Sequence, residues 1–599
     1  MAADDPLAAI DRAMAAGDFL TAYDRANAAL TQDPSRRVFG HRAVLALART
    51  GAAAAARDLF AELGLATYRE DEDIAGLEAR IVKDLALAES GTDRTRLARQ
   101  SADLYQQAFT ASGGFYSLIN AATMSLLAGD ADAASQKAAA ALGLLDMADG
   151  SDYWTVATRA EACLLTGNLE TMRGLIDRAA SLGDSTQCAS TRKNMKIIAA
   201  SLGLADTLFD PLKPARIAHV TGHMMAPPGG SGRFSPDAEY RVAAEITAML
   251  AQEKVGTIYG ALASGADILF AEAAFDAGVT VNVVLPFETD DFRRISVAPS
   301  GQSWLARFDQ CLARADMVTH ASQDAYTGED AIFAYGARHA MGLALLHARN
   351  LDTEALQLAV WDGRGTTFPA GTAVDVAAWR GRGQKTIVIA PGPPVQASSL
   401  APADAHAPPM EDRAPTKMRA MLFGDFAGFS KLPDHQIPRY VSQVLGRVGG
   451  LVDAYRDRTI HVNSWGDAIY LVFTDVVAAA DYALALQRAL TPEALSEADL
   501  PASLKLRMGL HIGPVYEMPD PITGRPGAFG AQVNKAARIE PVAPPGGIFV
   551  SEPFAAHLTF ESDLFALRYA GVIPSAKDYG AFRMYHLGVG AGAAVDHAP

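Results

Sequence analysis

The stretch MRAMLFGDFAGFSKL, residues 418–432, is an apolar run that contains a single acidic residue, Asp425. Its first half has the composition of a buried strand. Burying a carboxylate in such a run is costly unless it meets a cation or a metal ion. The stretch therefore predicts a strand that carries Asp425 to a polar site.

A second acidic residue follows about 40 positions later. Residues 459–473, TIHVNSWGDAIYLVF, outline a β-hairpin with NSWGD as its turn and Asp467 just past the tip. An amphipathic helix, residues 434–458, is expected between strand and hairpin. Strand, helix and hairpin would bring Asp425 beside Asp467. Singly, each aspartate is more often a turn or capping residue, but a converging pair predicts a site for two divalent cations, used for in-line phosphoryl displacement.

A third segment, GAFGAQVNKAARIE at residues 527–540, predicts a helix on which Asn534 and Arg538 stand four apart. Residues at this spacing project from one face. The guanidinium of arginine matches phosphate, and a neutral amide beside it can orient a ribose oxygen.

The three segments, in this order and at these separations, resemble the class III adenylate and guanylate cyclases, an α+β ferredoxin-like fold, here over residues 418–590. FGDFAGFS resembles the family's first metal motif, WGDAIYLVF the second, and GAQVNKAARIE the Asn and Arg motif. The resemblance implies two divalent ions, Mg²⁺ or Mn²⁺, bound by Asp425, Asp467 and the carbonyl of Phe426. It implies that Asn534 positions the ribose and that Arg538 stabilises the five-coordinate α-phosphate.

Further residues are expected on the triphosphate. The family uses a lysine near the C-terminus, and Lys577 lies about one residue from the expected spacing. The amides of Gly428, Phe429 and Ser430 precede a predicted helix, where free N–H groups suit the β- and γ-phosphates.

The base-reading positions fit neither of the family's codes. In the family, adenylate cyclases typically recognise the purine with a lysine and an aspartate or threonine, whereas guanylate cyclases favour a glutamate and a cysteine. In this sequence the two positions hold Asn463 and Gly527. ATP is the favoured substrate because adenylate cyclases are the commoner class, with cyclic AMP and pyrophosphate as products. The alternatives are a guanylate or dual-specificity cyclase, or a silent nucleotide-binding or dimerisation module. Because the family builds each pocket from two subunits, the resemblance also implies a homodimer.

Residues 1–208 are rich in alanine and leucine at helical spacing. The turn glycines Gly17, Gly51, Gly129 and Gly167 are 34, 78 and 38 residues apart, and 78 is two units of 39. Such a period is typical of stacked helical hairpins and resembles tetratricopeptide repeats. We expect this region to be a docking surface for a protein partner or a dimerisation arm. The alternative is a plain helical scaffold.

Residues 212–390 alternate short apolar strands with helices, which predicts an α/β doubly wound, Rossmann-like domain. Ligands of such folds bind beyond the carboxyl ends of the strands. The segments GALASGADILFAEAA and VVLPF resemble the SLOG group of nucleotide-sensing domains, which implies a regulatory site for a nucleotide-like ligand lined by Gly222, Gly265 and Glu272. The alternative is that the glycines only serve tight turns.

Residues 391–417 contain seven prolines and are expected to form a semi-rigid linker. The net charge of −16 argues against nucleic acid as a partner. Cys163, Cys188 and Cys311 lack metal-ligand spacing, which favours a reducing compartment. With no signal peptide and no apolar run of about 20 residues, a cytoplasmic protein that does not enter a membrane is expected.

Overall fold

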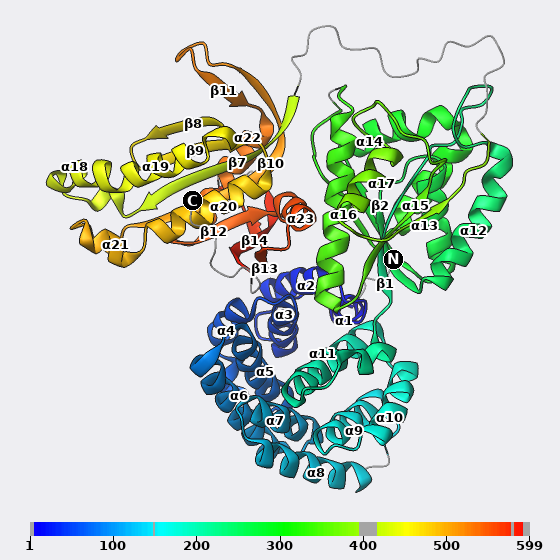
Figure 1. Cartoon of the computed structure of the whole chain (residues 1–599), viewed down its shortest axis with the longest axis vertical. Coiled ribbons are helices and arrows are strands. Elements are labelled where there is room, and N and C mark those ends of the chain that lie inside the picture. The colour runs from blue at the N-terminus through cyan, green and yellow to red at the C-terminus, as the bar shows by residue number, and fades with distance from the viewer. Residues whose placement is uncertain (1–4, 148–149, 327, 394–415, 577–579, 591–599) are drawn as a thin grey trace. The chain divides into compact units, whose positions relative to one another are not determined.

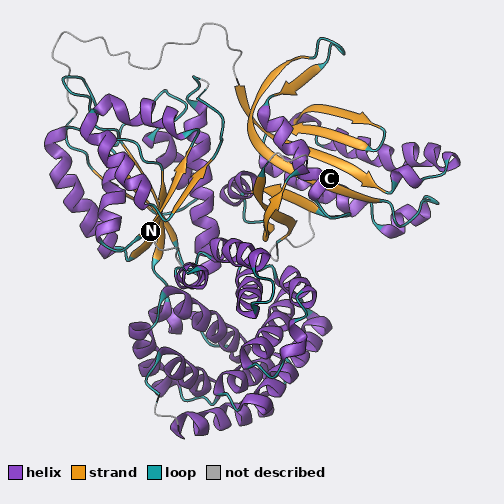
Figure 2. Ribbon diagram, turned by 180° about the vertical axis from the view of Figure 1, so that it is seen from behind, coloured by secondary structure: helices purple, strands orange, loops and turns teal. Residues whose placement is uncertain are grey.

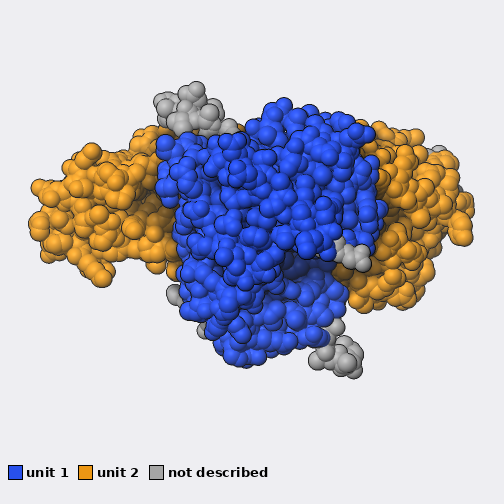
Figure 3. All heavy atoms as spheres, turned by 90° about the horizontal axis from the view of Figure 1, so that it is seen from below, with its two compact units in different colours: residues 1–215, 347–353, 569–571 blue, residues 216–346, 354–568, 572–599 orange. Residues whose placement is uncertain are grey.

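The computed structural model describes residues 5–147, 150–326, 328–393, 416–576 and 580–590. The chain forms two compact units, shown in different colours in Figure 3. Unit 1 comprises residues 1–215, 347–353 and 569–571. Unit 2 comprises residues 216–346, 354–568 and 572–599.

Unit 1 is built of antiparallel helices that stack in sequence order (Figure 1). The helices are α1 (Pro6–Ala15), α2 (Phe19–Gln32), α3 (Arg37–Arg49), α4 (Ala53–Glu62), α5 (Glu72–Ala88), α6 (Gly91–Ser112), α7 (Phe115–Leu127), α8 (Ala131–Met147), α9 (Tyr153–Leu165), α10 (Leu169–Leu182) and α11 (Ser185–Leu202). Alanines fill much of the space between them, since a small side chain lets two helices approach closely. The expected helical N-terminal region is confirmed.

The turn glycines mark the hairpins. Gly17, Gly51, Gly129 and Gly167 each follow the first helix of a pair and have φ values of 76°, 82°, 88° and 80°. Glycine adopts this left-handed conformation without steric cost. The turn missing from the 78-residue interval lies between α5 and α6, where Gly91 has φ 58°.

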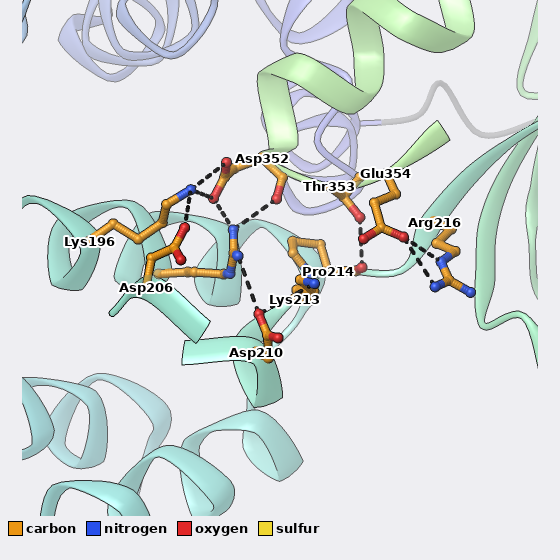
Figure 4. A network of polar contacts seen from close by, with 10 residues as sticks. Lys196, Asp206, Asp210, Lys213, Pro214, Arg216, Asp352, Thr353 and Glu354 are labelled. Carbon is orange, nitrogen blue, oxygen red and sulfur yellow. Dashed lines mark hydrogen bonds and ion pairs between the residues drawn. The ribbon is translucent and has the colours of Figure 1, made fainter. Parts of the chain in front are cut away.

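Three polar contacts hold local segments in place (Figure 4). Within unit 1, the carboxylate of Asp352 accepts hydrogen bonds from Arg192, which is buried, and from Lys196 of α11 at 3.3 Å. Within unit 2, Arg216 at the start of β1 donates to Glu354 at 3.1 Å, just before β5.

The first part of unit 2 has the parallel sheet that the sequence predicts. Its strands are β1 (Arg216–Gly222), β2 (Val255–Gly260), β3 (Thr280–Leu285), β4 (Met317–His320), β5 (Ala355–Val360) and β6 (Thr386–Ile389). All pairings are parallel, in the order β4-β3-β2-β1-β5-β6. Figure 2 shows helices against both faces. They are α12 (Glu239–Gln252), α13 (Ala266–Asp276), α14 (Thr289–Phe292), α15 (Gln302–Arg314), α16 (Ala331–Leu351) and α17 (Thr372–Gly381).

The C-terminal part of unit 2 is a mainly antiparallel sheet in the order β13-β14-β12-β10-β7-β9-β8, with β11 paired to β10. The strands are β7 (Thr416–Ala427), β8 (Thr459–Trp465), β9 (Ala468–Phe473), β10 (Lys505–Pro519), β11 (Pro526–Phe529), β12 (Ile548–Ser551), β13 (Phe565–Pro574) and β14 (Ala581–Val589). The helices are α18 (Ile437–Arg439), α19 (Gly446–Ala454), α20 (Val476–Ala489), α21 (Pro492–Glu497), α22 (Ala531–Ile539) and α23 (Glu552–Glu561). The long strands β7 and β10 lie at the centre.

The helix expected at residues 434–458 is present over residues 437–454. It consists of α18, a π-helical turn at Tyr440–Leu445 and α19, which follow one another without a break, and a 3₁₀ turn follows α19.

Two expectations about composition can be compared with the structure. Cys163, Cys188 and Cys311 are free and buried. Among the helices that the structure describes, none combines the length and apolar character needed to cross a membrane.

Candidate active site

The strand register brings Asp425 and Asp467 together. Asp425 of β7 is paired with Ala468, the first residue of β9. Asp467 directly precedes Ala468 in the turn between β8 and β9, so the two carboxylates meet at the end of the central strands. The convergence of the two aspartates is what the sequence predicts.

The turn that carries Asp467 is tight. Trp465 is paired with Ala468, which leaves only Gly466 and Asp467 between the strands. Gly466 has φ 67°. A glycine with positive φ at the first central position is typical of a two-residue hairpin whose twist matches that of its strands. The glycine therefore fixes where Asp467 points.

The two carboxylates disfavour each other's charge. The pKa of Asp425 is raised above its usual value, first by burial and then by the negative charge of Asp467. A pair of half-buried carboxylates that repel one another gains from a cation between them. Hard oxygen ligands of this kind suit Mg²⁺ and Mn²⁺.

Arg507 is a site residue that the sequence reasoning missed. It lies opposite Asp425 on β10, and its Nη2 donates to Asp425 Oδ2 at 2.8 Å. Its Nε donates to Glu540 Oε1 at 2.5 Å. A charged residue inside the apolar strand KLRMGLHIG is the same signal that identified Asp425, so the sequence could have indicated it.

Glu540 is a third carboxylate near the pair. Its pKa is raised to about 6, mainly by burial, with Arg507 opposing the shift and Asp425 adding to it. The close approach of Gly509 makes room for it, since a Cβ on Gly509 would lie 2.4 Å from the Glu540 amide nitrogen. Among the described residues no group of three or more acids, histidines or cysteines is placed to hold a metal ion. Two aspartates with waters and substrate phosphates still meet the needs of Mg²⁺, which seldom uses an all-protein cage.

The end of β7 leads into the predicted phosphate loop. The Phe426 side chain is buried against the Tyr440 ring, with centroids 5.4 Å apart, which leaves only its backbone for a ligand. Gly428 has φ 94° and begins a 3₁₀ turn over Phe429, Ser430 and Lys431. This turn therefore comes directly after the end of β7, the strand that carries Asp425 and Phe426.

Asn534 and Arg538 lie on one helix, as expected. They belong to α22, which begins after Gly530 and packs against β10 and β7. Ala536 and Ile539 are buried beneath it, Asn534 is exposed, and Arg538 is half-buried. Arg538 Nε is buried and has no hydrogen-bond partner among the described residues.

The two base-reading positions are on adjacent segments. His461 Nδ1 lies 2.7 Å from the carbonyl oxygen of Pro526, which joins β8 to β11. Asn463 is two residues further along β8, hence on the same face, and Gly527 follows Pro526. A Cβ on Gly527 would lie 2.7 Å from the Phe529 ring. The Phe529 ring thus takes up the space of a side chain at this position.

The remaining predicted residues lie elsewhere or beyond description. Lys577 is outside the described residues. Gly222 and Gly265 are close together, because the amide of Ala266 donates to the carbonyl of His223 at 3.2 Å. Glu272, by contrast, faces α15, where Arg307 donates to both of its carboxylate oxygens, at 2.8 and 2.6 Å.

Two family models match the chain. Residues 412–585 match the model described as Adenylate and Guanylate cyclase catalytic domain. Residues 18–125 match the model described as Tetratricopeptide Repeats-Sensor. The predicted resemblances of the C-terminal and N-terminal parts are thereby confirmed, while the SLOG resemblance of the middle part stays a prediction.

Two curated proteins and a solved structure are similar to part of the chain. "Putative adenylate cyclase 3" of Rhizobium meliloti (strain 1021) is 28% identical over 154 residues, which are 25% of this chain and 24% of that protein. "Adenylate cyclase" of Podospora anserina is 27% identical over 253 residues, 38% of this chain and 11% of that protein. The chain thus spans about a quarter or less of these relatives' lengths. The solved structure of the adenylyl cyclase CyaB from P. aeruginosa is 18% identical, with TM-score 0.26 over 29% of this chain and 96% of that chain.

Proposed function

We propose, from a catalytic domain of the adenylate and guanylate cyclase type at residues 412–585, that the protein converts ATP to 3',5'-cyclic AMP and pyrophosphate. The convergence of Asp425 and Asp467 carries the proposal, since paired carboxylates at a strand end suit two divalent ions. When bound, such ions would lower the pKa of the ribose 3'-hydroxyl and neutralise the triphosphate.

The protein's own residues supply binding and orientation. Asp425, Asp467 and the Phe426 carbonyl would hold the metal ions. The amides of Gly428, Phe429 and Ser430 would take the β- and γ-phosphates, together with Lys577. Asn534 orients the ribose so that its 3'-hydroxyl lies in line with the α-phosphate.

Arg538 and Arg507 supply positive charge. The free Nε of Arg538 is available to the charge that develops on the α-phosphate oxygens. Arg507 balances Asp425 at 2.8 Å, and it would turn to the triphosphate once a cation occupies the carboxylates. Catalysis is then mainly positioning and electrostatic stabilisation.

A guanylate or dual-specificity cyclase is the second candidate. The observation that favours it is Asn463, because an amide both donates and accepts and can thus address either purine edge. Gly527 adds no side chain that would discriminate. A silent nucleotide-binding module is the third, and it is opposed by the presence of both aspartates together with Asn534 and Arg538.

The upstream domains are proposed as regulators. The helical repeats would bind a protein partner, and the middle domain a nucleotide-like ligand near Gly222 and Gly265. The catalytic domain would act as a homodimer in the cytoplasm, because the metal-binding and Asn/Arg halves are expected to meet across a two-fold axis.

The test is an assay of the purified chain with ATP or GTP and Mn²⁺ or Mg²⁺, with the product identified by mass spectrometry. We expect cyclic AMP, and a loss of at least about a hundredfold in Asp425→Ala. Asp457→Ala is the matched control, because Asp457 is an exposed aspartate of the same domain. Absence of any cyclic nucleotide, with Asp425→Ala equal to the parent, would overturn the proposal.

A further inference from the structure

A cavity of about 120 Å³ lies inside unit 1. It is lined by one face each of α5, α7, α9 and α11, with one residue from α6. The size is comparable with the roughly 150 Å³ cavity that can hold a benzene-sized molecule. None of its lining residues belongs to the catalytic domain. The proposed functions above assign no role to this cavity.

The lining is polar, which is unusual for the interior of a helical stack. On α5, Arg80, Lys83 and Asp84 recur at spacings of three and four, so they share one face. On α9, Trp154 and Glu161 share the inner face in the same way. Each helix therefore contributes a stripe of polar or aromatic residues where the repeat architecture needs only small apolar ones.

Four helices meet in one hydrogen-bond network. Lys83 Nζ of α5 donates to Asn120 Oδ1 of α7 at 3.2 Å and to Asn194 Oδ1 of α11 at 2.6 Å. Asn194 Nδ2 in turn donates to Glu161 Oε2 of α9 at 2.6 Å. The side-chain amide of Asn194 thus links Lys83 to Glu161.

Arg80 and Asp84 also line the cavity, on the same face of α5 as Lys83. Arg80 Nε and Asp84 Oδ2 form an ion pair at 3.6 Å, and neither atom has a hydrogen-bond partner among the described residues. Nearly all buried polar atoms in proteins are paired. A polar molecule in the cavity would give these two residues hydrogen-bond partners.

The charge of the cavity is positive. Arg80, Lys83 and Lys193 line it, against Asp84 and Glu161. Burial raises the pKa of Glu161 and lowers that of Lys83, so the charges of both groups are weakened. The positive charge of Arg80 also extends to Arg49, whose pKa is lowered to about 10 by burial and then by Arg80. An anion in the cavity would relieve this imbalance.

We infer that this cavity binds the phosphate group of a small molecule. Arginine and lysine together are the usual ligands of phosphate, and three cationic against two acidic side chains favour an anionic occupant. The Tyr116 and Trp154 rings, 6.3 Å apart, form an aromatic wall beside the charged groups. The ligand is inorganic phosphate itself or a small phosphorylated metabolite.

A purely structural network is the alternative. It is disfavoured because buried ionic groups contribute little to stability compared with apolar packing. A structural role also predicts no binding of any small anion.

The experiment is isothermal titration calorimetry of the full, metal-free chain with inorganic phosphate, with acetate, and with adenosine 5'-monophosphate against adenosine. We expect phosphate to bind once per chain and acetate not to bind. Tighter binding of the monophosphate than of phosphate would identify a phosphorylated metabolite as the source. Lys193→Gln and Arg80→Gln should each weaken phosphate binding by about tenfold, the loss of one charge-assisted hydrogen bond.

Two controls separate this site from others. Arg173→Gln, an exposed arginine of α10, should leave phosphate affinity unchanged. Arg538→Ala should also leave it unchanged, since that residue belongs to the catalytic domain. Because Lys193 is exposed at the rim, Lys193→Gln is expected to fold even if Arg80→Gln does not.

The inference is overturned if phosphate does not bind, if acetate binds equally well, or if affinity is unaffected in Lys193→Gln. Loss of binding in Arg538→Ala would assign the anion to the catalytic domain instead. None of these outcomes depends on cyclase turnover, so failure here and failure of the proposed function are distinguishable.

Discussion

At the scale of single residues, the candidate active site is a balance of charge. Asp425 is destabilised by burial and by Asp467, and Arg507 partly compensates it through a 2.8 Å hydrogen bond. When no cation is bound, the carboxylates of such a site carry negative charge that nothing neutralises. This commonly lowers the stability of the folded protein.

The first prediction concerns Asp425→Asn. The folded pKa of Asp425 is raised, so ionisation of this residue destabilises the folded state above its unfolded pKa. The metal-free variant should therefore melt at a higher temperature than the parent at pH 7.5. The difference should shrink as the pH falls through the folded pKa and vanish below the unfolded one. Cyclase activity should fall by at least about a hundredfold.

Differential scanning fluorimetry in the presence of a chelator measures the first effect, and the cyclase assay measures the second. Asp457→Asn should change neither, because Asp457 is exposed. A lower melting temperature for Asp425→Asn at pH 7.5 would contradict the charge balance described here.

Sequence reasoning identified Asp425 and Asp467 because an acid within an apolar run and an acid at a hairpin tip are both visible locally. Arg507 and Glu540 were missed although Arg507 has the same local signal. Their role depends on the register of β7 against β10, which joins residues 82 apart in the chain. Such a pairing is set by tertiary packing rather than by local pattern.

At the scale of elements, the features that depend on a few neighbouring residues were predicted best. The hairpin turn and the repeat glycines are fixed by backbone sterics that act within a few residues. The helix expected at residues 434–458 forms over residues 437–454. Its apolar periodicity predicted the helix but not the π-helical turn inside it.

The second prediction concerns Gly466→Ala. Alanine at φ 67° is strained by about 1 kcal/mol, since its Cβ crowds the following carbonyl. We expect the free energy of unfolding of the catalytic domain to fall by about that amount. The turn should also shift Asp467, so the Mn²⁺ concentration for half-maximal activity should rise several-fold.

Urea denaturation and a metal titration of cyclase activity provide the measurements. Gly450→Ala is the matched control, because Gly450 lies in α19 with open space around its Cα, and alanine there should stabilise by about 0.5 to 1 kcal/mol. Equal effects of the two variants would show that Gly466 does not set the position of Asp467.

At the scale of the whole molecule, the order of the parts is a helical repeat region, a parallel sheet and a catalytic domain. A change in periodicity predicted the first two parts, and the three cyclase-like motifs predicted the third. The cavity in unit 1 was not predicted. Its walls come from several helices, and the hydrogen bond between Lys83 of α5 and Asn194 of α11 joins residues 111 apart. Local periodicity identifies each helix but not which polar faces meet.

The third prediction tests the proposed homodimer. Asp425→Ala and Arg538→Ala each remove one half of the expected shared pocket, so each variant alone should be inactive. A heterodimer of the two variants has one intact pocket and one that lacks both residues. It should therefore regain up to about half of the cyclase activity of the parent dimer.

Cyclase activity is measured after the two variants are mixed and allowed to exchange, with a fluorescence label reporting the exchange. A mixture of Asp425→Ala with Asp467→Ala is the matched control and should stay inactive, since both changes affect the same half. Absence of recovery after proven exchange would rule out a shared pocket.

The regular spacing of the turn glycines has a consequence for how the chain folds. Each helical hairpin of unit 1 contacts mainly its neighbours, so folding can begin at any hairpin and spread along the stack. The sheets instead require pairings between distant segments, such as β7 with β10, which form slowly because long loops must close first. During synthesis the N-terminal helices would thus be ordered while the catalytic strands are still being made.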